Sequence, residues 1–160
     1  MLELDALDHR ILTVLQQDAG LSNAALALRV HASEPTCLRR VRRLRKHGVI
    51  RGVVALLDPA VLGEPLTAIV EVSLDRQGAE AWAAFEAKAD AEPAILQCYR
   101  VGAGVDYVLV VTVRDMAAYQ GLVQRFLGAA NNVRNVRTLF SVARSKFGTA
   151  WWPPLGPEAL

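Results

Sequence analysis

Apolar residues recur at helical spacing in the first part of the chain. In residues 4–19 they return every three or four positions, which predicts an amphipathic helix. The apolar positions are Leu4, Leu7, Ile11, Leu12 and Leu15. Asp5 and Asp8 favour the start of this helix electrostatically. Gly20 interrupts the pattern, and residues 22–30 predict a second, shorter helix capped by Ser22.

A third helix is predicted over residues 33–47. Ser33 is a preferred N-cap, Pro35 falls in the first turn, and Gly48 supplies the stop. At about 100° per residue, Cys37, Val41 and Leu44 share one face. The short turn between the second and third helices predicts a helix-turn-helix, whose third helix would lie in the major groove of DNA.

Positive charge is concentrated in and just after this third helix. The cations are Arg39, Arg40, Arg42, Arg43, Arg45, Lys46 and Arg51. No Asp or Glu occurs between Glu34 and Asp58, whereas a solvated helix usually interleaves both signs. The pattern therefore favours DNA contact over a small helical bundle that binds nothing.

The exposed amino end of the third helix is expected to meet base edges, through Glu34, Pro35, Leu38 and Arg39. The cations further along are expected at phosphates. The whole set predicted at DNA is Ser22, Asn23, Ser33, Glu34, Pro35, Thr36, Leu38, Arg39, Arg40, Arg42, Arg43, Arg45, Lys46 and Arg51.

Residues 49–57 carry two β-branched runs around Arg51 and Gly52, which fits a short hairpin and would make a wing. Residues 1–57 are therefore predicted to form a winged helix-turn-helix domain. Asp58-Pro59 and Gly63-Glu64-Pro65 break regular structure, so residues 58–65 are predicted to be a linker.

The pattern of residues 66–150 changes to apolar strands separated by helices. Strands are predicted at 66–74, 95–101, 106–113 and 136–144, and helices at 78–91 and 115–130. This βαββαβ order predicts an α+β, ferredoxin-like domain with two helices on one face of an antiparallel sheet. The apolar strand 106–113 suggests that a second copy of the chain covers the other face. The tail, 151–160, holds Trp151 and Trp152, which we expect to dock on the body or on a partner.

Composition narrows the picture only slightly. The net charge is +2, from 18 Lys+Arg against 16 Asp+Glu, so the basic character is local. The two cysteines, Cys37 and Cys98, lie in apolar patterns and are expected to be core residues rather than reactive thiols or metal ligands. The N-terminus lacks the pattern of a signal peptide, and no apolar run is long enough for a membrane span, so a cytoplasmic, nucleoid-associated protein without a cofactor is expected.

The first half resembles the N-terminal half of the Lrp/AsnC family of bacterial and archaeal transcription regulators. The most specific matches are Leu4-Asp5, Asp8, Ile11-Leu12, Leu21-Ser22, Leu26-Ala27, Ser33 through Leu44, Gly48-Val49-Ile50, Asp58-Pro59 and Leu62-Gly63. The second half is similar in its element order, and the resemblance covers about residues 2–147. It implies a sequence-specific regulator that pairs sheet to sheet, binds a roughly palindromic operator in double-stranded DNA and is expected to assemble from homodimers into octamers.

The resemblance also implies a small effector, commonly an amino acid, bound near the turn between the second and third strands. The matching residues are Gly102, Ala103, Gly104, Asp106 and Tyr107, with Arg137 and Thr138 near the last strand. Ala103 stands where the family pattern has glycine, and Phe140 replaces a polar residue. A tight strand connection without a ligand is the alternative interpretation of this turn.

Two other functions fit the same architecture. A siroheme-decarboxylase-like enzyme would usually carry His and Arg residues in the sheet domain, but all three histidines precede residue 50 and the strand-turn-strand region holds only Arg100. A weakly specific, DNA-wrapping architectural protein would use the same basic helix as a regulator.

Overall fold

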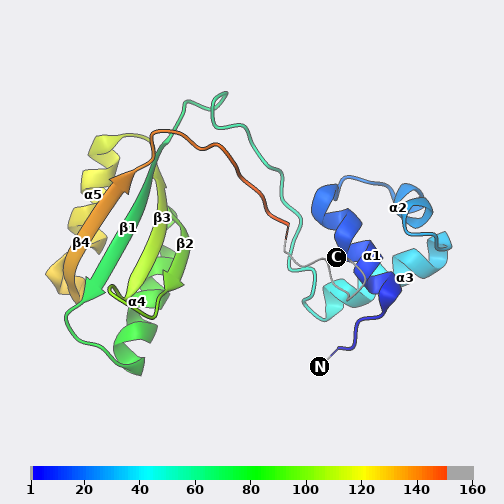
Figure 1. Ribbon diagram of the computed structural model, residues 1–160, viewed down its shortest axis with the longest axis horizontal. Helices are drawn as coiled ribbons and strands as arrows, with labels where there is room; N and C mark the ends of the chain where they lie inside the picture. Colours follow the sequence, from blue (N-terminus) through cyan, green and yellow to red (C-terminus); the bar gives the residue numbers. More distant parts are fainter. Residues whose placement is uncertain (1, 151–160) are drawn as a thin grey trace. The chain divides into compact units, whose positions relative to one another are not determined.

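Two separate apolar cores organise the chain. The computed structural model describes residues 2–150, in which residues up to Leu56, together with residues 146–150, make up one unit and Leu57–Ser145 build the other (Figure 1). The first core is helical, and the second lies between a sheet and two helices. The expected docking of Trp151 and Trp152 lies outside the described residues.

The N-terminal unit contains the three predicted helices, α1 (Ala6–Gln17), α2 (Asn23–Arg29) and α3 (Glu34–Lys46). Asp5 is the N-cap of α1 and accepts hydrogen bonds from the backbone N–H groups of Leu7 and Asp8. Asp8 accepts in return from the N–H of Asp5, which completes a capping box. Gly48 adopts φ +71°, and this left-handed residue ends α3 as predicted.

Apolar residues of all three helices form the first core, including Ile11, Leu26, Cys37 and Leu44. The predicted packing face of α3 is therefore confirmed. His31, with φ 55°, makes the turn that joins α2 to α3.

The hairpin predicted over residues 49–57 is wrong. The N–H groups of Val49 and Ile50 both donate to the carbonyl of Leu44, so the first β-branched run is tied to the end of α3 and cannot pair as a strand. Residues 51–57 have no regular structure and are exposed. A turn follows at residues 59–63, where the N–H of Val61 donates to the carbonyl of Asp58.

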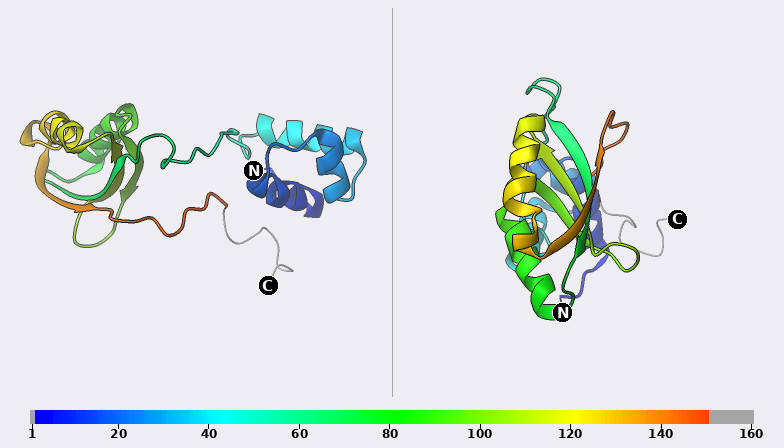
Figure 2. Two further views of the ribbon diagram at one scale, coloured as in Figure 1. Left: turned by 90° about the horizontal axis from the view of Figure 1, so that it is seen from above. Right: turned by 90° about the vertical axis from the view of Figure 1, so that its left-hand side faces the viewer.

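The second unit is the predicted ferredoxin-like fold. Its elements are β1 (Leu66–Leu74), α4 (Ala79–Ala91), β2 (Ile95–Arg100), β3 (Tyr107–Val113), α5 (Met116–Phe126), a 3-10 turn η1 (Ala129–Asn131) and β4 (Val133–Phe140). The strands form an antiparallel sheet in the order β2-β3-β1-β4. Helices α4 and α5 lie on the same face of that sheet (Figure 2).

Alternation along the strands divides their side chains between two faces. Ala68, Val70 and Val72 of β1 are buried beneath the helices. The intervening Ile69 and Glu71 point to the other face, together with Val108 and Val110 of β3 and, across from Ile69, Leu139 of β4. We call this second surface the open sheet face; among the described residues, neither helix of this unit covers it (Figure 2).

Several predicted boundaries and one burial prediction need correction. Helix α5 ends at Phe126 rather than near residue 130, and β4 runs from Val133 to Phe140 rather than to residue 144. Cys37 is buried as predicted, but Cys98 is exposed. Because β2 is an edge strand, the apolar character of residues 95–101 does not bury them within one chain.

Candidate nucleic-acid interface and effector site

The exposed side of α3 carries cations along its length. Arg39, Arg42, Arg45 and Lys46 are all exposed, and so is Arg51 beyond the helix. At the amino end, Glu34, Pro35 and Leu38 are also exposed, and Leu38 retains 38% of its accessible surface. One continuous side of α3 therefore presents positive charge together with a free amino end.

The remaining arginines of α3 turn toward α1. Arg40 Nη1 lies 2.6 Å from Asp5 Oδ2 and 3.2 Å from Asp8 Oδ2, and Arg43 Nη2 lies 2.7 Å from the same Asp8 oxygen. Asp8 is completely buried, at 0% exposure. Two of the predicted DNA contacts thus have an anionic partner inside the protein.

These contacts shift the ionisation of the partners. The N–H of Asp8 and the guanidinium of Arg40 hold the pKa of Asp5 below its ordinary value. The hydrogen bond to Asp5 in turn raises the pKa of Arg40. Both residues stay charged at neutral pH.

The sequence contains a signal for this cluster that the helix prediction did not use. Asp8 precedes Ile11, Leu12 and Leu15 by three, four and seven positions, so it lies on the apolar face of α1. A carboxylate on a packing face requires a cation.

Other polar contacts tie the three helices together near the predicted interface. Asn23 Nδ2 donates to the carbonyl of Glu34 at 3.0 Å, and Arg10 Nε donates to the carbonyl of Val30 at 3.2 Å. Ser22 is exposed and caps α2 through its Oγ. Ser33 caps α3 only by its backbone, because its hydroxyl donates to Thr36 Oγ1 instead.

In the second unit, the turn between β2 and β3 borders an open hollow of about 510 Å³. Its lining consists of Gln77, Trp82, Arg100, Val101, Gly102, Ala103, Gly104, Val105 and Asp106. The structure therefore brings together Gly102, Ala103, Gly104 and Asp106 of the predicted effector set. Gly104 adopts φ +83°, so it supplies the left-handed residue of the turn, and Ala103 does not need to.

Asp106 fixes this turn to the end of β1. Its Oδ2 accepts a hydrogen bond of 2.7 Å from the N–H of Leu74, and its Oδ1 accepts one of 3.0 Å from Gln77 Nε2. The N–H of Asp106 also donates to the carbonyl of Val72. Both carboxylate oxygens are therefore already occupied by the protein.

The N–H groups of Gly102, Ala103 and Gly104 donate to no acceptor among residues 2–150. Beside them, the guanidinium of Arg100 lies 5.0 Å from the centre of the Trp82 ring. Trp82 and Arg100 were not predicted as site residues, because they come from α4 and β2 and meet at the turn only in the folded sheet.

The other predicted effector residues do not line this hollow. Tyr107 is fully buried, and its hydroxyl donates to Glu86 Oε1 at 2.9 Å; burial and then this bond raise its pKa. Arg137 pairs with Glu71 on the open sheet face, at 3.2 Å. Thr138 is on the helix side, where its hydroxyl bonds that of Tyr119. Alternation along β4 thus separates Arg137 from Thr138.

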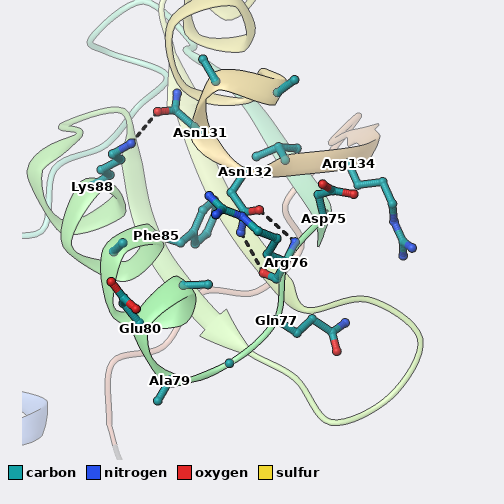
Figure 3. Close-up of a pocket in the computed structure, with 16 residues that line it drawn as sticks. Asp75, Arg76, Gln77, Ala79, Glu80, Phe85, Lys88, Asn131, Asn132 and Arg134 are labelled. Atoms are coloured by element: carbon teal, nitrogen blue, oxygen red, sulfur yellow. Dashed lines mark hydrogen bonds between the residues drawn. The ribbon is translucent and has the colours of Figure 1, made fainter.

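A larger open hollow of about 810 Å³ lies between the β1–α4 loop and the start of β4 (Figure 3). Arg76, Phe85, Lys88 and Asn132 are among the residues around it. Some of its polar groups are engaged with each other: Lys88 Nζ donates to Asn131 Oδ1 at 2.7 Å, and Asn132 exchanges two hydrogen bonds with the backbone of Arg76. No sequence pattern predicted this hollow.

Within residues 2–150, His, Cys, Asp and Glu side chains form no group of three suited to a metal ion. In the same part of the chain, no helix has the length and apolar character needed to cross a membrane.

Both units match known protein families. Residues 4–51 match a family model described as winged helix-turn-helix DNA-binding, and residues 67–151 match one described as the Lrp/AsnC ligand binding domain.

Whole-chain relatives agree with these matches. The chain is 40% identical over 144 residues to a leucine-responsive regulatory protein of Rhizobium meliloti, covering 90% of this chain and 92% of the relative. It is 41% identical over 135 residues to one from Haemophilus influenzae, covering 84% and 81% of the two chains.

Solved structures of similar proteins share the fold. An AsnC family transcriptional regulator from Agrobacterium tumefaciens has a TM-score of 0.83 at 34% identity, covering 92% of this chain and 96% of that one. A transcriptional regulator from Neisseria meningitidis, solved as a complex with L-Met, has a TM-score of 0.83 at 32% identity, covering 93% and 96%.

Proposed function

Because the chain belongs to the Lrp/AsnC family of DNA-binding transcription regulators, we propose that α3 enters the major groove with its amino end against base edges. The observation that carries this proposal is the exposed cationic side of α3, which continues from a free amino end. In this arrangement Arg39 reads a base, while Arg42, Arg45 and Lys46 bind phosphates.

The division between base and phosphate contacts can be tested by substitution. Arg39→Ala should cost on the order of 1–3 kcal/mol of binding free energy on the preferred sequence and relax the sequence preference. Arg42→Ala should weaken binding to all sequences about equally. Fluorescence anisotropy with a duplex selected from a random pool, and with a shuffled duplex of the same composition, measures both effects. Equal losses on both duplexes for Arg39→Ala would contradict base reading.

We propose that two copies pair through the open sheet face. Ile69, Val108, Val110 and Leu139 give this face an apolar centre that the helices of its own unit leave uncovered. A dimer would present two α3 helices, which suits a roughly palindromic operator, and dimers would assemble further into octamers. Val110→Asp should shift the mass measured by analytical ultracentrifugation toward monomer, whereas the exposed Arg114→Asp should not. An unchanged mass for Val110→Asp would contradict this interface.

We propose that the hollow at the β2–β3 turn binds an amino acid by its carboxylate. The free N–H groups of Gly102, Ala103 and Gly104, together with the Arg100 guanidinium, are donors suited to an anion. The relative solved with L-Met supports an amino acid as the class of ligand. Asp106 would hold the turn in place rather than meet the ligand's ammonium group.

Isothermal titration with leucine, methionine and other amino acids tests the effector proposal. Arg100→Gln should weaken the binding at least tenfold, while Arg114→Gln should leave it unchanged. Heat from none of the amino acids, or unchanged binding by Arg100→Gln, would contradict it.

A DNA-wrapping role remains the second candidate, because it uses the same exposed cations. Competition with nonspecific DNA at a fixed salt concentration separates the two, since only a specific regulator keeps a large affinity ratio. We propose a regulator at promoters on the nucleoid without enzymatic activity. Soret absorbance in the purified protein would instead favour the siroheme-decarboxylase-like alternative.

A further inference from the structure

The seven cations in and after α3 fall into two groups by direction. Arg39, Arg42, Arg45, Lys46 and Arg51 are exposed, whereas Arg40 and Arg43 have side chains that are only 19% and 35% exposed. Arg40 and Arg43 lie three residues apart, and each directly precedes a buried residue, Val41 or Leu44. They are therefore on the side of α3 that packs against α1. We call Asp8, Arg40 and Arg43 the inward clamp.

Asp8 holds both arginines through one oxygen. Its Oδ2 accepts from Arg40 Nη1 and Arg43 Nη2, and Arg43 Nη2 also donates to the carbonyl of Glu3 at 3.1 Å. Asp8 Oδ1, Arg40 Nε and Arg43 Nε are buried and find no hydrogen-bond partner among the described residues. These three polar atoms of the clamp are thus out of contact with water.

A buried carboxylate needs its cations more than a phosphate in water does. If either guanidinium left Asp8 to bind a DNA phosphate, the completely buried anion would lose half of its compensation. The exposed arginines of α3 have no such penalty. The burial therefore favours keeping both inward arginines on Asp8 when DNA binds.

We propose that Arg40 and Arg43 are positioning residues: together with Asp8 they fix the orientation of α3 on α1, and they do not bind phosphates. This inference rests on the proposed DNA-binding function. It replaces the expectation that every basic residue of α3 contacts DNA, and it limits the phosphate contacts of this helix to the exposed cations.

The salt dependence of binding separates the two groups. Gln substitutions remove the charge and keep much of the length, so we compare Arg40→Gln and Arg43→Gln with the matched exposed variants Arg42→Gln and Arg45→Gln. Removing one phosphate-binding cation should reduce the slope of log K against log salt by about 0.9. We expect that reduction for the exposed variants and no change in slope for the inward ones. Instead, the inward variants should lower the affinity ratio between the selected and shuffled duplexes about tenfold.

Removing the anion gives a second, opposite test. Asp8→Asn removes a negative charge. If the two arginines were available to phosphates, this change would strengthen binding to both duplexes. Positioning predicts about tenfold weaker binding to the selected duplex with no weakening on the shuffled one. Asp18→Asn makes the same charge change at an exposed position of the same unit and should leave the ratio unchanged.

Partial unfolding would lower the fraction of active protein and weaken the apparent binding to both duplexes by the same factor. The ratio of the two affinities therefore reports positioning separately from stability. Slopes reduced by about 0.9 in Arg40→Gln and Arg43→Gln would overturn the clamp and leave the proposed function standing. If the slopes were also unchanged in Arg42→Gln and Arg45→Gln, or if the wild-type chain bound no DNA, both the inward clamp and the proposed function would be overturned.

Discussion

Replacing Asp106 by alanine should destabilise the second unit, because this carboxylate joins the β2–β3 turn to the end of β1. The substitution removes the acceptor of the Leu74 N–H, a hydrogen bond of 2.7 Å, and the acceptor of Gln77 Nε2. The Leu74 residue is only 1% exposed. Its N–H would therefore be left without a partner in a region that water reaches poorly.

The size of the destabilisation depends on which of the two lost hydrogen bonds is buried. A buried donor that loses its acceptor costs about 1–3 kcal/mol, whereas the exposed contact to Gln77 adds little. We expect a decrease of about 2 kcal/mol in the free energy of unfolding of this unit. For a domain of this size, roughly 4–8 °C per kcal/mol converts that value to a decrease in Tm of about 8–16 °C. Asp106→Asn keeps an acceptor without the charge and should lose about half as much.

Hydrogen exchange measured peptide by peptide reports the stability of this unit separately from that of the helical unit. Peptides covering β1 and β3 should exchange faster in Asp106→Ala, and peptides covering α1 and α3 should be unchanged. Asp75→Ala, an exposed carboxylate that directly follows β1, is the matched control and should behave like the wild-type protein. If Asp106→Ala changed the opening free energy of β1 by less than about 0.5 kcal/mol, the bond to Leu74 would not stabilise the turn.

Three further outcomes are expected. Asp8→Ala should lower the free energy of unfolding by about 3 kcal/mol, near the lower limit for breaking a buried ion pair, because Arg40 keeps its contact with Asp5. Urea unfolding followed by far-ultraviolet circular dichroism measures this change, and a decrease below about 1 kcal/mol would contradict a stabilising role of the inward clamp. Tyr107→Phe should cost only about 1 kcal/mol, since Glu86 can turn to water, while Glu86→Ala leaves the buried hydroxyl with only its long contact of 3.5 Å to the carbonyl of Trp82 and should cost more; equal Tm values would refute this ordering. Because the folded pKa of Asp5 is lowered, its contribution is complete above its ordinary pKa of 3.8 and is lost as pH falls through the folded pKa, so acid unfolding of Asp5→Asn should lack this component.

Local patterns were sufficient for most of the secondary structure. The strand predicted at residues 66–74 matches β1 at both ends, Ser22 caps α2 as predicted, and Asp5 and Asp8 lie at the start of α1. Gly48 ends α3 as predicted. Periodicity, capping and glycine stops act between residues a few positions apart, so they are readable from the chain alone. The same local information carries the basic helix and the resemblance to the Lrp/AsnC family.

Predictions failed where a contact that the apolar pattern does not encode decided the outcome. The hairpin at residues 49–57 did not form because Val49 and Ile50 bond back to Leu44. Cys98 is exposed because β2 is at the edge of the sheet. Arg137 and Thr138, adjacent in sequence, face opposite sides of β4, so one face of the sheet does not present both side chains.

The chain by itself determined which residues are basic and that they gather on α3, since composition and helical spacing are properties of the sequence. Only the packing of α3 on α1 decided which of those cations stay exposed and which pair with a carboxylate. Arg43 meets Asp8 across 35 positions of the chain, and no local pattern specifies a contact at that separation. Burial then makes the difference, because a guanidinium group in water stays available to an external anion, whereas one against the core is needed by a buried carboxylate.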